Sequence, residues 1–393
     1  MTLTLLSWLV AAPILALNGI LGTELAFGLK PTRPRSAQDK RVARTTILMP
    51  AHNEELGIAV TIAALKPELN EGVRLLVVAD NCTDRTAQRA RDAGAEVIER
   101  RDLTQRGKGH ALSFGRDWLC ADPPECVIVL DADCVVAPGA IADLSHAALT
   151  DGRPTQGCYL LRPRIGDSPM VQISNFAFLI KNKVRQRGSA RIGAPAILGG
   201  TGMAFPWALF RNAPLATSDL VEDLALGIYF TQNCRPPVFL EQAMIWSDPA
   251  GTTDTLTQRT RWEHGFIDAA TRRAIPLFIQ GFRRGKPGLA WLGLHLLVPP
   301  LALLVTLGGL AIALCTMLAL VGAHWTPAVA CACALGAIAC LLLVNWAMTG
   351  REAVRGSTLV RIPLYLLWKL PVYLRLVRKR ESEWVRTKRM GEK

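Results

Sequence analysis

Acidic side chains follow three short apolar runs of this sequence, and each run predicts a β-strand. Glu54, Asp80 and Asp131 come shortly after the three runs. If the strands are parallel, their carboxyl ends share one edge of the sheet, and the carboxylates gather there. Like charges at such an edge repel one another, so the cluster calls for a cation. The runs lie at 45–49, 73–78 and 126–130.

Helix capping is a second interpretation of the same acids. Asn53 and either Asp80 or Asp84 can each cap the helix that follows its loop. Capping accounts for about one side chain in each loop. It leaves the succession of three acid-bearing strand ends unexplained.

Asp131 and Asp133 form the sharpest pair in this set. Carboxylates at positions i and i+2 that leave a buried strand together can offer oxygens to one hard cation. Mg²⁺ or Mn²⁺ held in this way completes its coordination with water and phosphate oxygens. Such a metal neutralises a diphosphate leaving group, so the pair predicts metal-assisted transfer chemistry.

Two glycine-containing turns carry further candidates. Lys108 stands between two glycines just before a predicted helix, where it and the backbone amides can approach a phosphate. A flexible surface loop fits this tripeptide equally well. Thr201 lies in a glycine-rich turn at 197–203, between two apolar runs.

The second half of the chain adds a possible base and an aromatic contact. Glu222 and Asp223 open a helical pattern, where acids favour the helix dipole or where one carboxylate serves as a general base. Gln258, Arg261 and Trp262 follow about 27 residues before the long apolar segment. Arg261 can pair with phosphate, and Trp262 can stack on a sugar or pack at a membrane edge.

Alternating strand and helix patterns predict the fold that positions these residues. A further strand is predicted at 95–98, and helical patterns occupy 54–66, 83–93 and 108–120. This alternation predicts an α/β fold with a mostly parallel sheet and helices on both faces. Ligands of such sheets bind beyond the carboxyl ends of the strands, which is where the acids lie.

A run of 62 residues, 289–350, contains no Asp, Glu, Lys or Arg. As one helix it would extend roughly 93 Å, enough for two crossings of a bilayer core about 30 Å thick. We place the crossings near 292–321 and 327–348. The apolar stretch 2–23 is interpreted as a retained anchor, because it lacks the charged start and the cleavage site of a signal peptide.

The net charge of +13 is concentrated beside the apolar segments. Residues 30–44 carry +5 and residues 351–393 carry +8, whereas 45–350 carry only +1. This positive-inside distribution places 30–288 and the C-terminus in the cytoplasm. A nearly neutral central domain also argues against nucleic-acid binding, which requires a basic stripe on the fold.

Two smaller features limit the remaining classes. The ten cysteines include no CxxC pair, so neither a zinc site nor a disulfide framework is predicted. In the tail, 357–380, apolar residues at helical spacing alternate with basic ones, which predicts an amphipathic helix at the membrane interface.

The motifs together resemble family 2 glycosyltransferases over roughly 45–290. They look most like the membrane-embedded branch that includes cellulose, hyaluronan and poly-N-acetylglucosamine synthases. Six motifs in this order carry the resemblance: N-E-E at 53–55, D-x-x-x-D-x-T at 80–86, D-x-D at 131–133, G-G-T-G at 199–202, E-D at 222–223 and Q-x-x-R-W at 258–262.

The resemblance implies a GT-A-like, Rossmann-like cytoplasmic domain, a nucleotide-sugar donor and inversion at the anomeric carbon. It implies that Asp223 is the catalytic base and that Asp131 and Asp133 bind Mg²⁺ or Mn²⁺. Asp80 matches the residue that contacts the donor base, usually uracil. The other donor-binding residues it implies are Lys108, Asp131, Gln258, Arg261 and Trp262, and the acceptor-binding ones are Thr201, Glu222 and Trp262.

The predicted organisation departs from that branch in one respect. Synthases that export their own polymer tend to have more spans, whereas this chain predicts about three. Two acceptors therefore stay open: a growing polysaccharide, with an oligomer or export partner, or a lipid-linked acceptor that receives one sugar. The expected location is a bacterial cytoplasmic membrane. The expected segments are an anchor at 1–29, the enzyme at 30–288, two spans at 289–350 and an interfacial tail at 351–393.

Two other classes fit parts of the sequence. The segment 129–135 also matches the aspartyl-phosphatase pattern, in which Asp131 would be a nucleophile, but that motif normally follows the first strand of its domain. A membrane scaffold or transporter component is the third reading. Transport predicts ionisable residues inside the spans, and 289–350 has no Asp, Glu, Lys or Arg.

Overall fold

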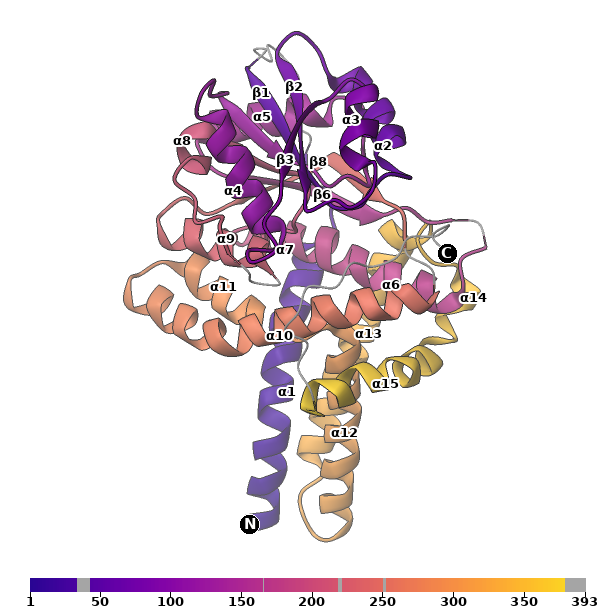
Figure 1. Cartoon of the computed structure of the whole chain (residues 1–393). Helices are drawn as coiled ribbons and strands as arrows, with labels where there is room; N and C mark the ends of the chain where they lie inside the picture. Colours follow the sequence, from indigo (N-terminus) through magenta and orange to yellow (C-terminus); the bar gives the residue numbers. More distant parts are fainter. Residues whose placement is uncertain (34–42, 165, 218–220, 250–251, 379–393) are drawn as a thin grey trace.

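The computed structural model describes residues 1–33, 43–164, 166–217, 221–249 and 252–378. Of residues 252–258, 261 and 375–378 it describes the backbone alone. A domain built on a β-sheet stands above a group of long helices, with other helices lying across the junction between them (Figure 1).

Within these residues an eight-stranded sheet has the order β3-β2-β1-β4-β7-β6-β8-β5. Strands β3, β2, β1 and β4 are parallel to one another, and they coincide with the four predicted strands. The α/β class and the mostly parallel sheet are therefore confirmed. The bounds are β1 Thr45–Ala51, β2 Val73–Asp80, β3 Glu96–Arg100, β4 Cys126–Val129, β5 Cys134–Val136, β6 Thr155–Leu161, β7 Met203–Pro206 and β8 Val238–Ser247.

The central strands are apolar throughout because helices cover both faces of the sheet. Ile47 and Met49 of β1 pack on one side with α2, α3 and α5, whereas Leu48 packs on the other side with α4, α8 and α9. All three side chains are fully buried. The helices are α2 Ile58–Leu65, α3 Thr86–Asp92, α4 Lys108–Leu119, α5 Ala140–Asp151, α8 Trp207–Phe210 and α9 Glu222–Gln232.

The second half of the sheet is mixed, and the sequence patterns did not predict it. Strand β7 runs antiparallel to both β4 and β6, while β6 and β8 are parallel. Strand β5 is a three-residue strand that pairs antiparallel with the end of β8. This half brings the loop before β7 and helix α9 up to the carboxyl ends of the parallel strands.

In the part of the chain that the structure describes, three helices are long and apolar enough to cross a membrane: α1 Thr2–Phe27, α12 Leu301–Leu320 and α13 Thr326–Asn345, which continues as a π-helical turn to Gly350. Figure 1 shows them extending side by side away from the sheet domain. Small buried side chains fill the space between them, including Ala11, Cys315 and Cys331.

One expected span is shorter than predicted. The segment near 292–321 is two helices, α11 Pro287–Leu297 and α12, with a break at Val298, which has extended backbone. Pro299 and Pro300 explain the break, because proline lacks an N–H donor and forces the residue before it out of helical geometry. Helix α11 packs against α10 (Thr252–Arg283) rather than continuing the span.

Helices α10, α11 and α15 (Ile362–Arg378) lie across the junction, beside the short helices α6 (Pro169–Leu179), η2 (Ile180–Arg185), α7 (Gln186–Arg191) and α14 (Gly356–Leu359) (Figure 1). The exposed face of α15 is apolar, with Leu364 and Leu367 56% and 66% exposed. Its Lys369 is fully buried and forms an ion pair with Glu263 of α10 at 2.6 Å. This helix therefore faces outward with its apolar side, as an interfacial helix does.

The end of α1 is fixed to the sheet domain by a buried carboxylate. Glu24 is fully buried, and Arg185 donates to it at 2.6 Å. His295 and Trp291 of α11 also contact Glu24, at 2.6 and 3.1 Å. Gly188 of α7 allows the close approach, because a Cβ there would overlap the backbone of Glu24.

Candidate functional site

A cavity of about 1070 Å³ opens at the carboxyl ends of the parallel strands. The loops after β1, β2 and β4, the start of α4, the start of α9 and the middle of α10 line it. Cavities of roughly 300–1,000 Å³ hold ligands of drug size, so this one has room for a nucleotide together with a sugar. The cluster of acids predicted from the sequence lies in this cavity.

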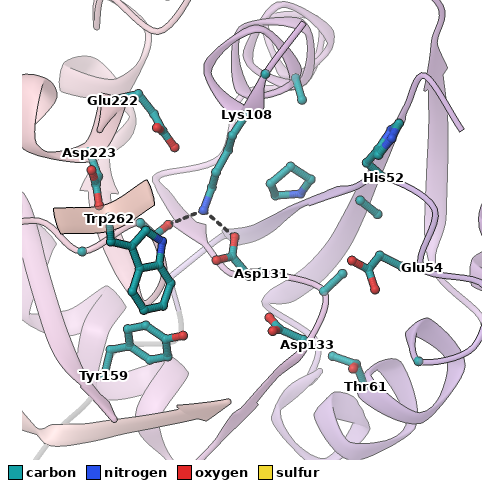
Figure 2. A pocket seen from close by; sticks show the side chains of 18 of the residues that line it. His52, Glu54, Thr61, Lys108, Asp131, Asp133, Tyr159, Glu222, Asp223 and Trp262 are labelled. Atoms are coloured by element: carbon teal, nitrogen blue, oxygen red, sulfur yellow. Dashed lines mark hydrogen bonds and ion pairs between the residues drawn. The ribbon is translucent and has the colours of Figure 1, made fainter. Parts of the chain in front are cut away.

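Lys108 lies at the centre of the acids (Figure 2). It is the first residue of α4, and Gly107 before it has φ +119°, a value that favours glycine. The Lys108 ammonium donates to the carboxylate of Asp131 and to the carbonyl oxygen of Gly200, the latter at 2.7 Å. Burial alone would lower the pKa of Lys108, but the carboxylates of Asp131 and Glu222 outweigh it and raise the pKa, so the lysine stays charged.

Asp131 is held from behind by Thr201. The backbone N–H of Asp131 donates to the Thr201 hydroxyl at 3.0 Å, and the Cys134 sulfur lies 3.3 Å from the same oxygen. Thr201 itself is fully buried. The acceptor contact predicted for Thr201 therefore has no support in the geometry, because its side chain faces the protein interior and positions Asp131 instead.

The carboxylates of Asp131 and Asp133 fit a hard divalent cation. With Cys134 they form a group whose ligand atoms lie within 4.8 Å of one another. Burial raises the pKa of the Cys134 thiol well above its usual value, and a neutral thiol is a poor ligand for Mg²⁺ or Mn²⁺. The two carboxylates remain, both partly exposed to the cavity. The Lys108 ammonium, already bound to Asp131, indicates that this carboxylate accepts a cation.

Glu222 and Asp223 face the same space from the first turn of α9. Burial raises the pKa of Glu222 to about 8, with the charge of Asp223 as the next cause. Burial also raises the pKa of Asp223. Two weaker effects lower it: the Leu224 N–H, which donates to Asp223 at 2.8 Å, and the charge of Lys108. A carboxylate with a raised pKa is a stronger base, so the pair suits proton abstraction near neutral pH.

Gly200 keeps the two groups open to each other. It has φ +84°, and a Cβ at this position would lie 3.4 Å from Asp223 Oδ2 and 3.5 Å from Lys108 Nζ. A side chain larger than alanine would therefore extend between Asp223 and Lys108. The glycine-rich turn identified in the sequence thus serves the site through its backbone.

Asp80 and Trp262 border the cavity on different sides. Asp80 ends β2, is 7% exposed, and accepts a hydrogen bond from Arg100 at 2.8 Å. Trp262 of α10 lies beside Phe178, with 5.8 Å between the ring centroids. The side chains of Gln258 and Arg261, from the same motif as Trp262, lie outside the described part of the chain, so their predicted roles stay predictions.

The sequence interpretation missed three residues at the site. Tyr159 of β6 and Lys181 of η2 line the cavity. Arg259 lies beneath Trp262, its guanidinium carbon 5.1 Å from that ring. A signal existed for two of them: Lys181 interrupts an apolar run, and Arg259 falls inside the motif at 258–262, of which only Gln258, Arg261 and Trp262 were considered.

Comparison with known proteins identifies the domain. Residues 46–190 match the family model described as glycosyl transferase family 2. Residues 46–190 therefore form a family 2 glycosyltransferase domain, so the family and the enzyme class predicted from the motifs are confirmed, whereas the membrane-embedded branch stays a prediction. No curated protein matches the chain significantly.

Solved structures agree on the fold. A mannosyltransferase from Pyrobaculum calidifontis, PcManGT, in complex with GDP-Man and Mn²⁺, matches with a TM-score of 0.55 at 16% identity, over 95% of this chain and 100% of that one. This likeness confirms the GT-A-like fold class. A glucosyl-3-phosphoglycerate synthase from Mycobacterium tuberculosis, in complex with Mn²⁺, UDP-glucose and phosphoglyceric acid, is less similar. Its TM-score is 0.40 at 19% identity, over 62% of this chain and 85% of that one.

The raised pKa values predict a particular pH profile for turnover. Activity should fall as the pH drops through the pKa of Asp223, which lies above the ordinary value of about 4, because a protonated base cannot accept a proton. A second change is expected near pH 8, where Glu222 ionises. The measurement is kcat between pH 5 and 10, with changes of about a tenth of the maximal kcat resolved.

Glu222→Gln is the matched variant for this profile. Because Glu222 is protonated at pH 7, glutamine should preserve activity there and remove the second change near pH 8. A large loss of activity at pH 7 in Glu222→Gln, with the profile above pH 8 unaltered, would contradict the assignment.

Proposed function

We propose that this protein transfers a sugar, with inversion, from a nucleotide-sugar to a lipid-linked acceptor at the cytoplasmic face of a membrane. One observation carries the proposal: in a single cavity, Lys108 lies between two carboxylates suited to a metal, Asp131 and Asp133, and two suited to act as a base, Glu222 and Asp223. The family 2 domain at 46–190 supports the same reaction class. Mg²⁺ or Mn²⁺ is the proposed cofactor, in keeping with the Mn²⁺ bound by PcManGT.

The donor is proposed to lie across the strand ends. A divalent cation held by Asp131 and Asp133 would neutralise charge on the departing nucleoside diphosphate. Lys108 supplies a second positive charge next to it, fixed by Asp131 and Gly200. Asp80 is proposed to contact the nucleotide base. Gln258 and Arg261 are proposed to hold the diphosphate, as their motif implies.

The acceptor is proposed to approach from the side of α9 and α10. Its hydroxyl oxygen forms the bond to the anomeric carbon as the bond from that carbon to the diphosphate oxygen breaks, and the hydroxyl proton passes to Asp223. Glu222, protonated at neutral pH, can donate a hydrogen bond to a sugar or acceptor oxygen. Trp262 offers an aromatic face on which a sugar ring can stack.

The membrane location is supported by surfaces as well as by the three apolar helices. On α10, Phe282 is 78% exposed and Ile275 58%, which suits contact with lipid better than with water. The exposed leucines of α15 add further apolar surface. The basic segments at 30–44 and 351–393 favour the cytoplasmic side for the sheet domain.

Single addition is proposed rather than polymerisation. Small side chains such as Ala11, Cys315 and Cys331 pack between α1, α12 and α13, which fills the bundle where an exported glycan would have to pass. A polymerase that works with a partner or as an oligomer is the alternative. The length of the product separates the two.

Replacement of the proposed base tests the mechanism. Asp223→Asn should bind the nucleotide-sugar as the natural enzyme does and lose turnover by about 10²–10⁴-fold, the usual contribution of a general base. Donor affinity is measured by calorimetry and turnover by release of nucleoside diphosphate in the presence of acceptor. Asp117→Asn, on the exposed face of α4 with 64% of its side chain accessible, is the matched control and should behave as the natural protein. Undiminished turnover in Asp223→Asn would remove it from the role.

A donor and acceptor panel tests the activity itself. Purified protein is incubated with UDP- and GDP-sugars, Mn²⁺ and a membrane lipid extract, and the lipid products are analysed by mass spectrometry. We expect one donor to yield a lipid whose mass increases by a single sugar. A ladder of products would favour polymerisation, and no product from any donor would contradict the proposed function.

A further inference from the structure

A second, smaller cavity of about 100 Å³ lies between the main cavity and the apolar helices. Leu21 of α1, Leu301 at the start of α12 and Tyr365 of α15 line it, so it sits where the proposed spans meet the sheet domain. One buried water needs about 10–15 Å³ of cavity volume measured in the same way. A cavity of about 100 Å³ can therefore hold a phosphate-sized group but not a nucleotide. The two cavities share four lining residues: Phe178, Lys181, Trp262 and Phe266.

Arg259 gives this small cavity its chemical character. The side chain is 7% exposed, and its Nε and Nη2 atoms have no hydrogen-bond partner among the described residues. The guanidinium carbon lies 4.7 Å from the ring centroid of Phe178 and 5.1 Å from that of Trp262. Aromatic faces attract a cation, but they leave its N–H donors unsatisfied, and buried unsatisfied donors are costly. The free N–H groups therefore lack an anionic acceptor.

Glu263 is the carboxylate in the lining of this cavity among the described residues, and its Oε1 binds Lys369 at 2.6 Å. Glu24 lies outside the lining and binds Arg185 at 2.6 Å. Neither carboxylate lies within 4 Å of Arg259 among the ion pairs of the described residues. The charge of Glu263 acts on both Lys369 and Arg259, but among the described residues it makes no hydrogen bond with Arg259, whose Nε and Nη2 atoms remain available to an anion.

Lys181 connects this charge to the catalytic pair. It lies in the wall common to both cavities, with its ammonium 5.6 Å from the ring centroid of Phe266. Burial lowers the pKa of Lys181, while the charge of Asp223 acts in the opposite direction. An anion bound near Arg259 would therefore lie next to Lys181, on the side of the main cavity where Asp223 acts.

We propose that the smaller cavity binds the phosphate group of the lipid acceptor, with Arg259 and Lys181 as its ligands. This inference rests on the proposed function and adds the class of its acceptor: a lipid that carries a phosphate close to the hydroxyl that receives the sugar. The lipid chain would extend past Leu21 and Leu301 along the apolar helices. The hydroxyl would project past Trp262 towards Asp223. The phosphate binds and orients the acceptor and takes no part in bond formation.

Binding of a model amphiphile tests the inference without any sugar transfer. The full-length protein in dodecyl maltoside is titrated with dodecyl phosphate by calorimetry, and inorganic phosphate is titrated in parallel. We expect Arg259→Gln to weaken dodecyl phosphate binding by about 10–100-fold, the usual effect of losing hydrogen bonds from a charged group. Arg259→Lys, which keeps the charge but loses the planar fork, should fall between the two. Arg272→Gln is the matched control, because Arg272 lies on the same helix with its side chain 72% exposed.

The outcomes separate this inference from the proposed function. Equal binding of dodecyl phosphate by the natural protein, Arg259→Gln and Lys181→Gln would overturn the phosphate site. Equal affinity for inorganic phosphate and dodecyl phosphate would overturn the assignment of the ligand as a lipid. Thermal unfolding of each variant without ligand verifies its fold, and Lys181→Gln supplies the comparison if Arg259→Gln does not fold. Arg272→Gln should bind dodecyl phosphate and transfer sugar as the natural protein does. Failure of the natural protein to transfer sugar to any lipid of the donor and acceptor panel refutes the proposed function and leaves the binding result intact.

Discussion

Four carboxylates and one ammonium group set the constraint on which this structure depends. Asp131, Asp133, Glu222 and Asp223 face a single cavity, and Lys108 is the cation at its centre. The acids that line this cavity outnumber the lysines and arginines that line it, so the acids retain protons or require a further cation. Glu222 and Asp223 have raised pKa values, so they tend to retain protons. Asp131 and Asp133 suit a divalent metal, which would supply the further cation.

The fold supplies these groups from two directions. The parallel strands deliver Asp131 and Asp133 at the end of β4, as carboxyl ends of parallel strands commonly deliver ligand-binding residues. The mixed half of the sheet positions Gly200 and, through α9, the two acids Glu222 and Asp223. The buried ion pair at Glu24 then joins this domain to α1, and the pair at Glu263 joins α10 to α15. As a result the acceptor side of the cavity lies next to the proposed membrane surface.

The sequence predicted the parallel half of the fold and much of the site, for reasons that are local. Strands β1, β2 and β4 contain apolar runs with polar ends, β3 is marked by two apolar residues between charged ones, and Asp131 and Asp223 stand at element boundaries that the pattern marks. Strand β5, with three residues, is too short to produce a pattern. The break at Val298 was overlooked because hydropathy does not register the effect of two prolines on the helix.

Other residues could not be assigned from local pattern. Thr201 belongs to a motif, but whether its hydroxyl faces a ligand or the backbone of Asp131 depends on how β7 pairs with β4. Lys369 and Arg259 look like solvent-facing cations of amphipathic helices, yet both are buried by packing between helices distant in sequence. Lys369 finds Glu263 there, 106 residues away, whereas Nε and Nη2 of Arg259 find no protein acceptor among the described residues.

The central claim is that the acids at the strand ends form a metal site completed by a nucleoside diphosphate. Electron paramagnetic resonance of Mn²⁺, titrated into the purified protein with and without UDP or GDP, measures this coupling directly. The account predicts that one of the two nucleotides tightens Mn²⁺ binding, that Asp131→Asn abolishes the effect, and that Asp122→Asn, on an exposed loop, preserves it. Mn²⁺ binding that is independent of both nucleotides, or that survives unchanged in Asp131→Asn, would contradict the account.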